Sequence, residues 1–352
     1  MKPLAYTLSY IFPVLTVCTM LVGGWSLLFV PLLTFGLVPF LELFFHGTKE
    51  NFDKEAELER VANPIFDWLL YLIVPAQVLL VSMMVYLCYI GHLQGWEIVG
   101  AVFTVGICCG SFGINVAHEL GHRNTKHEQF LSKVLLLTSL YMHFFIEHNK
   151  GHHAKVATPE DPASSRKNQT LYAFWFRSVF LSWVSAWKIE NRRLRKHRLP
   201  FLRMDNQMLQ FQIIQLATVL GIAFVAGWTA CAAFVGAACV GFLLLETVNY
   251  VEHYGLSRNQ KANGRYERVR PHHSWNANHP IGRLLLFELT RHSDHHAYPG
   301  RKYPSLRHFD FSPQLPTGYP GMILLALFPP LFFAVMNPCL ERELERMDAL
   351  AA

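Results

Sequence analysis

The sequence has few charged residues, and three long stretches contain no lysine or arginine. Only 16% of its 352 residues are Asp, Glu, Lys or Arg, against roughly 25% in soluble domains. The three stretches are residues 3–48, 61–122 and 204–257. A helix needs about 20 apolar residues to cross a bilayer, so each stretch is long enough for two crossings. The composition therefore argues against a soluble enzyme or a nucleic-acid-binding protein and indicates a membrane protein.

Two further features are missing. The seven cysteines form no Cys-x-x-Cys pair, which excludes a built-in rubredoxin or a thiolate zinc site. No cleavable signal peptide is expected, because the N-terminal apolar stretch is about twice the length of a signal core and lacks a clear small-residue cleavage site. We interpret this stretch as a pair of membrane anchors.

The apolar stretches predict an all-α integral membrane protein with six transmembrane helices and a cytosolic, histidine-rich cap. Basic residues gather at one end of the predicted helices, and the turns at the other end carry none. Because loops rich in Lys and Arg stay in the cytosol, we expect both termini there. We treat residues 1–352 as one membrane-embedded domain, with cytosolic or interfacial parts at 123–207 and 252–352. The predicted crossings are residues 4–24, 25–46, 64–90, 97–122, 208–228 and 229–251.

Nine histidines fall into three clusters and a singleton, each at the predicted cytosolic end of a helix. Two pairs, His118 with His122 and His148 with His152, are four residues apart, so each pair shares one helix face. Neutral imidazole is the commonest metal ligand in proteins. Nine such ligands are too many for one ion, so the sequence predicts two metals at a membrane surface. The nine are His118, His122, His148, His152, His153, His253, His292, His295 and His296.

The ligand type does not identify the metal by itself. Imidazole suits zinc, copper, iron and nickel. A structural zinc takes about four ligands, often thiolates, and magnesium or calcium takes oxygen ligands. We favour two redox-active ions.

Carboxylates stand next to several of these histidines. On a helix, a neighbouring residue points about 100° away, so these acids are not expected to bind the same metal. They can instead accept the second ring N–H of a histidine on another helix and fix its tautomer. His272 and His273 are further candidates, and we expect His273 to support the site rather than bind metal. The acids are Glu119, Glu147, Glu252 and Asp294.

These motifs together resemble the integral-membrane alkane 1-monooxygenase (alkane hydroxylase) family, a non-haem di-iron branch of the desaturase-like enzymes. NYVEHYG is the most specific motif, because wider desaturase-like enzymes share the other histidine boxes only loosely. The chain has Thr290 where the family usually has Gln, which gives no reason to doubt the ligands. The matching segments are HELGHR at 118–123, FFIEHNKGHH at 144–153, NYVEHYGL at 249–256, RPHHSWN at 270–276, RHSDHHA at 291–297, YPSLRHF at 303–309 and LPTGYPG at 315–321.

The resemblance implies that the nine histidines hold two irons. It also implies hydroxylation of medium- or long-chain n-alkanes to 1-alkanols with O2. Electrons would come from a separate rubredoxin, reduced by an NAD(P)H-dependent reductase. The expected location is the bacterial inner membrane, with the active site on the cytosolic side and lipid-dissolved alkane entering sideways.

Attack at the terminal carbon requires a narrow apolar tunnel that admits only the end of the alkane. Such positioning can be worth several kcal/mol. Thr34 and Gly36 are small among bulky neighbours, and we predict that a small residue here leaves room for longer chains. The alternative is ordinary helix–helix packing at a small residue.

Other functions remain open. A related lipid desaturase or aryl-methyl hydroxylase would share the architecture. The segment HELGH at 118–122 also matches the zinc metalloprotease signature, in which Glu119 would be the general base, although this leaves most of the clustered histidines unexplained. A metal carrier would need polar residues along the crossings, and they hold few.

Two segments between the fourth and fifth crossings allow two interpretations each. Residues 171–197 are amphipathic, which is typical of an interfacial helix or of a packed helix in a cytosolic cap. The basic segment 192–203 could dock an acidic redox protein or contact anionic lipid headgroups.

Overall fold

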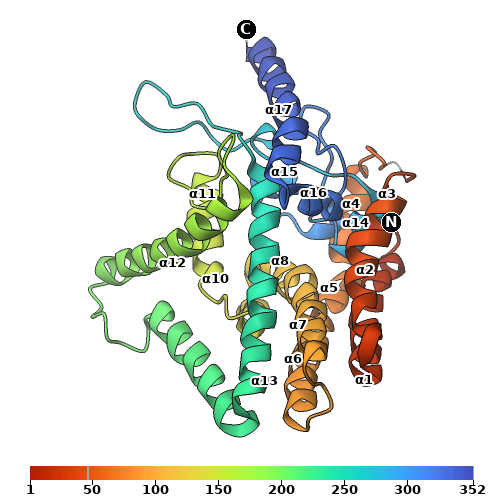
Figure 1. Ribbon diagram of the computed structural model, residues 1–352. Helices are drawn as coiled ribbons and strands as arrows, with labels where there is room; N and C mark the ends of the chain where they lie inside the picture. The colour runs from red at the N-terminus through yellow and green to blue at the C-terminus, as the bar shows by residue number, and fades with distance from the viewer. Residues whose placement is uncertain (46, 352) are drawn as a thin grey trace. The chain divides into compact units, whose positions relative to one another are not determined.

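The computed structural model (Figure 1) describes residues 1–45 and 47–351 and is built from helices. Those residues contain no β-sheet; isolated bridges pair Gln260 with Tyr266 and Asn276 with Gln314. The predicted all-α class is therefore confirmed. His46, at the end of the predicted crossing 25–46, lies outside the described residues.

The chain divides into two compact units, which are described separately. Each unit is assembled from three stretches that are far apart in the sequence. The prediction of a single domain over 1–352 stays a prediction. Unit 1 comprises Met1–Gly36, Ala62–Lys150 and Ser182–Leu245, and unit 2 comprises Leu37–Val61, Gly151–Leu181 and Glu246–Ala352.

The described residues contain five helices long and apolar enough to cross a membrane. Four of them match the first four predicted crossings to within a few residues. The number of crossings and their orientation stay predictions. The five are Pro3–Val22, Gly24–Glu42, Pro64–Tyr89, Trp96–Gly121 and Gln207–His253.

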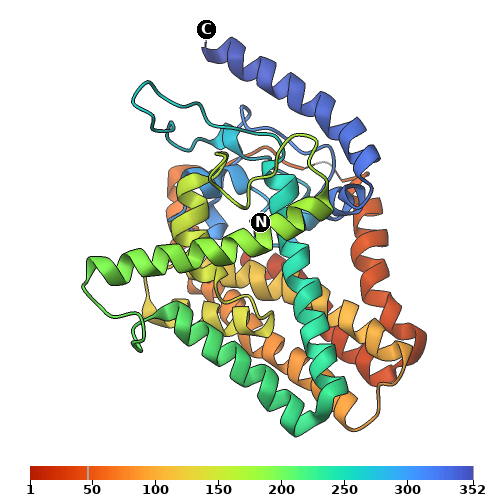
Figure 2. The same cartoon turned by 60° about the vertical axis from the view of Figure 1, so that its left-hand side comes forward.

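The fifth of these helices, α13 (Gln207–His253), is 47 residues long and bends at Gly227, where φ is 83° and ψ is 170°. Figures 1 and 2 show its two arms meeting in a V at the bend, where the chain turns back. Near the bend the Cys231 Sγ lies 3.6 Å from the Val219 carbonyl oxygen. The bend falls where the predicted crossings 208–228 and 229–251 meet. Gly227 permits it, because a backbone with this positive φ favours a residue without a Cβ.

The helices of unit 1 include most of the candidate membrane helices. Short 3-10 and π segments, labelled η, interrupt them. In chain order they are η1 (Pro3–Tyr10), α1 (Ile11–Val22), η2 (Gly24–Leu28), α2 (Phe29–Leu32), η3 (Leu33–Leu37), α5 (Pro64–Tyr71), α6 (Ile73–Tyr89), α7 (Trp96–Cys108), η4 (Cys109–Ile114), α8 (Asn115–Gly121), α9 (Lys126–Thr138), α10 (Phe144–Glu147), the first residues of η5 (His148–His152), the end of α12 (Leu171–Lys196) and most of α13.

Unit 2 has shorter helices joined by loops. It also holds the start of α12 and the last turns of α13. Its other elements are α3 (Val38–Glu42), α4 (Lys54–Ala62), α11 (His153–Lys155), η6 (Pro271–His273), α14 (Pro280–Leu285), α15 (His292–Ala297), η7 (Tyr303–Ser305), α16 (Tyr319–Ala326) and α17 (Pro329–Ala351).

Close backbone approach holds α7 and its continuation η4 against the second arm of α13 in unit 1. A Cβ added at Gly106 would lie 2.5 Å from the Cβ of Val240, and one added at Gly241 would lie 2.6 Å from the Cβ of Cys109. Neither glycine can take a larger side chain unless the neighbouring helix moves. Small residues at such crossings allow the dispersion contacts that bind helices in lipid.

A buried arginine organises the loops of unit 2. The guanidinium of Arg291 donates to the carbonyls of Leu306 (2.8 Å), Thr48 (3.2 Å) and Glu50 (3.1 Å). It is fully buried, so its hydrogen bonds replace the water it gave up on folding. Arg291 directly precedes α15, and these bonds therefore fix the start of the helix that carries three of the nine histidines.

Candidate metal centre

Four buried histidines of unit 2 point their ring nitrogens at one another. His152 ends η5, His253 ends α13, and His292 and His296 lie one turn apart on α15. The Nε2 atoms of His152 and His296 are 3.2 Å apart, and those of His253 and His292 are 3.3 Å apart. Their candidate ligand atoms all lie within 4.8 Å of one another. We call these residues the four-histidine group.

The separations in the four-histidine group fit a metal ion. Two nitrogens about 2.1 Å from a common ion in tetrahedral geometry lie roughly 3.4 Å apart. The group is buried, and burial of several imidazoles without a cation or a shared proton leaves their lone pairs facing each other at a cost. Imidazole donors suit iron, zinc, copper or nickel.

An aspartate that the sequence did not single out lies behind this group. The Asp161 Oδ2 atom is 2.8 Å from His152 Nδ1 and accepts a hydrogen bond from Ser164 Oγ at 2.6 Å. Burial alone would raise the pKa of Asp161, but the charge and hydrogen bond of His152 and the bond from Ser164 hold it below its usual value. The ionised carboxylate keeps the proton of His152 on Nδ1, so that the Nε2 lone pair faces the group.

Glu252 contacts the four-histidine group from the end of α13. Its Oε2 atom lies 3.1 Å from His292 Nε2, the nitrogen that also faces His253. Its Oε1 atom accepts a short hydrogen bond from the Tyr319 hydroxyl. We predicted that this acid would accept the second ring N–H of a histidine; in the structure it approaches the nitrogen on the inner side of the ring.

A second histidine cluster lies in unit 1. His118 is on α8, His122 caps the end of α8, and His148 begins η5. The Nε2 atoms of His122 and His148 are 3.1 Å apart, and the rings of His118 and His148 are perpendicular with centroids 4.3 Å apart. Phe144 stacks on His148 at 4.6 Å. We call these three histidines the triad.

The remaining two predicted ligands form a pair in unit 2. The Nε2 atoms of His153 and His295 are 3.1 Å apart. Every one of the nine histidines therefore lies in a close group with other members of the predicted set. The structure therefore brings the predicted residues together, which the spacing argument alone did not show, and their role as metal ligands stays a prediction.

Two other predicted acids make their contacts with arginines. Glu119 accepts a hydrogen bond from Arg123 at 2.8 Å, and this buried ion pair does not suit the free general base that a metalloprotease requires. Asp294 accepts from the backbone N–H of Arg307 at 2.8 Å and lies 3.4 Å from the Arg301 guanidinium. Burial raises the pKa of Asp294 to about 6, although these arginines oppose the shift. Glu147 is also buried.

His273 uses both of its ring nitrogens in local contacts. Its Nδ1 accepts from the Arg270 backbone N–H at 3.0 Å, and its Nε2 lies 3.4 Å from Glu267. Burial lowers the pKa of His273 to about 3. The ring is neutral, and Nδ1 is occupied by the Arg270 N–H; the supporting role of His273 stays a prediction. The next residue, Ser274, lies 3.5 Å from Nδ1 of His253.

The two predicted channel residues face different ways in η3. Thr34 is buried, and its hydroxyl donates to the Val30 carbonyl at 2.8 Å. Gly36 is exposed, and a Cβ added there would meet nothing within 4 Å. Of the two, Thr34 faces the interior of unit 1.

Sequence reasoning missed Asp161 and Tyr319. Asp161 lies in a loop nine residues after His152, beside the exposed Glu160, and nothing in the local pattern separates the two acids. Tyr319 lies in the LPTGYPG segment that carried part of the resemblance, but its partner Glu252 is 67 residues away in sequence. No spacing rule could have paired them.

Relatives cover most of the chain. The family model described as fatty acid desaturase matches residues 94–326. Alkane 1-monooxygenase 2 of Pseudomonas aeruginosa is 44% identical over 309 residues, which are 86% of this chain and 81% of that protein. Alkane 1-monooxygenase of Ectopseudomonas oleovorans is 38% identical over 90% of this chain and 79% of its own length. The xylene/toluene monooxygenase hydroxylase component of Pseudomonas putida is 27% identical over 79% and 74%.

Proposed function

The chain belongs to the alkane 1-monooxygenase family, and from that premise we propose that it hydroxylates medium- or long-chain n-alkanes at the terminal carbon. The reaction is alkane, O2, two electrons and two protons giving a 1-alkanol and water. A separate rubredoxin, reduced by an NAD(P)H-dependent reductase, supplies the electrons. The proposed location is the bacterial inner membrane, with both termini and the site on the cytosolic side, which the distribution of basic loops supports.

The observation that carries the proposal is the four-histidine group. Its donors are imidazoles, its nitrogen separations fit a metal, and it is buried. We propose that the nine histidines together bind two iron ions. When bound, the irons would supply the oxidising power that cleaves a C–H bond with O2.

The protein's own residues prepare this site. Asp161 holds the proton of His152 on Nδ1, and Tyr319 holds Glu252 in place by donating to Oε1. Glu252 in turn stands beside Nε2 of His292. The burial of all these side chains excludes water, which strengthens each electrostatic contact.

The substrate would reach the site along an apolar channel in which Thr34 faces inward. Thr34→Trp should lower the oxidation of hexadecane relative to octane by roughly tenfold or more, because added bulk shortens the channel. The ratio of the two alcohols, measured by gas chromatography, reports the effect, and Thr34→Leu gives a milder variant. Gly36→Trp is the matched control, since its side chain would point into open space. An unchanged ratio in Thr34→Trp rules the channel role out.

Product and metal analysis test the whole proposal. Purified protein with rubredoxin, reductase and NADH should convert octane and hexadecane to 1-alkanols and contain about two irons per chain. The second candidate is aryl-methyl oxidation, because one relative is the hydroxylase component of a xylene/toluene monooxygenase. Xylene oxidised while alkanes are left untouched would establish that candidate. A fatty acyl lipid that gains a double bond would point to a desaturase, and one zinc per chain would refute both.

A further inference from the structure

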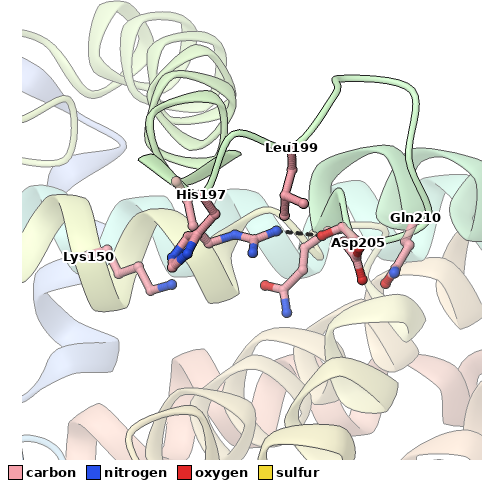
Figure 3. Close-up of a pocket in the computed structure, with 7 residues that line it drawn as sticks. Lys150, His197, Leu199, Asp205 and Gln210 are labelled. Carbon is pink, nitrogen blue, oxygen red and sulfur yellow. Dashed lines mark hydrogen bonds between the residues drawn. The ribbon is translucent and has the colours of Figure 1, made fainter. Parts of the chain in front are cut away.

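A polar pocket of about 640 Å³ lies in unit 1 at the junction of α12 and α13. Its walls come from the end of α12, the loop that follows, the first turn of α13 and one residue of η5. Figure 3 shows Lys150 and His197 together at one end, with Asp205 and Gln210 at the other. The pocket includes part of the basic segment 192–203, for which the sequence left two interpretations open.

The acidic groups around the pocket already have cationic partners. Arg193 donates to both carboxylate oxygens of Glu190, at 2.8 and 2.7 Å, and Glu190 is 1% exposed. Glu190 also accepts from the backbone N–H of Gln207 at 2.7 Å, which fixes the start of α13. Asp205 forms an ion pair with Arg203. Both acids are therefore already paired with arginines, although the charge of Lys150 also reaches Glu190 and helps to lower its pKa.

The end of the pocket with Lys150 and His197 has an excess of positive charge. Lys150 is exposed and forms no ion pair among the described residues. Lys133 lies nearby, with its ammonium 4.5 Å from the centre of the Phe145 ring. Burial lowers the pKa of Lys133, and the charge of Lys150 lowers it further. Lys133 and Lys150 carry like charges that repel each other, and His197 lies with Lys150 at this end of the pocket, so this end favours the binding of an anion.

The surroundings of the pocket match the boundary of a membrane. Gln207 begins a candidate membrane helix, and the ends of membrane helices lie near the headgroups. The loop between α12 and α13, which Figure 2 also shows, exposes Phe201 (50%), Leu202 (81%) and Met204 (75%). Apolar side chains beside a cationic pocket are suited to acyl chains beside a phosphate.

We propose that this pocket binds the phosphate-bearing headgroup of an anionic phospholipid. Lys150 and His197 contact the phosphate, and Phe201, Leu202 and Met204 insert among the acyl chains. Arg193 keeps a structural role, because removing it would leave the buried Glu190 without its cationic partner. Lys150 lies in η5 between His148 and His152, but the proposal rests on neither the metal nor the choice of substrate.

Thermal unfolding of the purified protein in detergent tests the proposal. Short-chain phosphatidylglycerol should raise the Tm by roughly 2 °C or more, because a ligand that binds only the folded state stabilises it. Phosphatidylcholine and inorganic phosphate at the same concentration should do much less. The double variant Lys150→Gln/His197→Gln should lose most of the shift. The matched control Arg195→Gln/Lys196→Gln removes charge from the same helix end outside the pocket and should keep the shift.

A third variant, Leu202→Ser, tests the acyl contacts without touching the charges. It should reduce the shift given by phosphatidylglycerol and still fold, since Leu202 is exposed. Equal shifts in wild type and in Lys150→Gln/His197→Gln would overturn the proposal, as would equal losses in the two double variants. A full shift with inorganic phosphate would mean a free-anion site. If Lys150→Gln/His197→Gln raises the KM for an acidic electron donor but keeps the Tm shift given by phosphatidylglycerol, the pocket is a protein-docking surface.

Discussion

The structure shows different contacts around the rings of the four-histidine group and around those of the triad. In the four-histidine group, loops supply polar contacts to the rings: Asp161 to His152 and Ser274 to His253. In the triad, helical segments set the positions, and Phe144 stacks on His148. Hydrogen bonds decide which ring nitrogen carries the proton, whereas packing decides only where the ring lies. The two clusters should therefore respond to different substitutions.

Removal of one ligand from each cluster should give the largest effect. His292→Ala and His118→Ala should each reduce activity to background and lower the iron content from about two to about one per chain. Residues that only support a histidine cannot replace it as a metal ligand. A chelator should remove the iron left in His118→Ala more slowly than the iron left in His292→Ala. The former is held by the four-histidine group, which is buried and has polar contacts to its rings. Iron analysis before and after chelation measures this.

The exposed His127 provides the control for ligand removal. It belongs to neither cluster, so His127→Ala should keep both irons. Equal rates of chelation in the two ligand variants would erase the difference between the clusters. Loss of both irons in each variant would show that the two clusters bind metal as one unit.

The next largest effect should follow from Asp161→Asn. The amide keeps the shape of the carboxylate but loses its charge, and outer partners of metal-binding histidines typically contribute 10–100-fold to affinity. We expect an iron affinity about 10–100-fold weaker, measured by competition with a chelator. Glu160→Gln is the matched control, since the Glu160 side chain is 64% exposed and pairs with Lys155. Equal affinities in the two variants would mean that Asp161 does not orient His152.

Local geometry explains what the sequence could predict. His118 and His122 could be paired because a helix brings residues four apart onto one face, and the ends of apolar stretches placed the clusters near helix ends. The first four membrane helices followed from hydropathy in the same way. Each of these inferences uses residues less than about 25 apart, the length of a single helix.

The rest depended on contacts across long loops. Asp161 reaches His152 because the loop after η5 folds back, and Glu252 meets His292 across 40 residues of chain that includes η6 and α14. Asp294 stands beside two ligands in sequence, yet its oxygen turns to Arg307. Loop folding of this kind has no periodic signal in the sequence, so the sequence could not show that Asp294 would face Arg307 while Glu252 would face His292.

A smaller effect should come from Tyr319→Phe. The change removes the hydroxyl that donates to Glu252 and leaves a buried acceptor short of a partner, which costs about 1–3 kcal/mol. We expect the Tm to fall by roughly 2–6 °C and iron to be lost less readily than in Asp161→Asn. Tyr298→Phe is the control, because Tyr298 is 47% exposed. If both tyrosine variants melt at the wild-type temperature, the bond from Tyr319 to Glu252 contributes nothing to the group.

The smallest effect should come from Phe144→Leu, which tests the packing of the triad. Stacked rings contribute about 0.5–1.5 kcal/mol beyond burial, so the Tm should fall by roughly 1–3 °C. Iron affinity should change little, because Phe144 positions His148 without affecting its protonation. Asp161→Asn should show the opposite ratio, with a large loss of affinity and a small change in Tm. If Phe144→Leu instead weakens iron binding as much as Asp161→Asn does, ring packing anchors ligands as firmly as hydrogen bonding, and the contrast between the clusters fails.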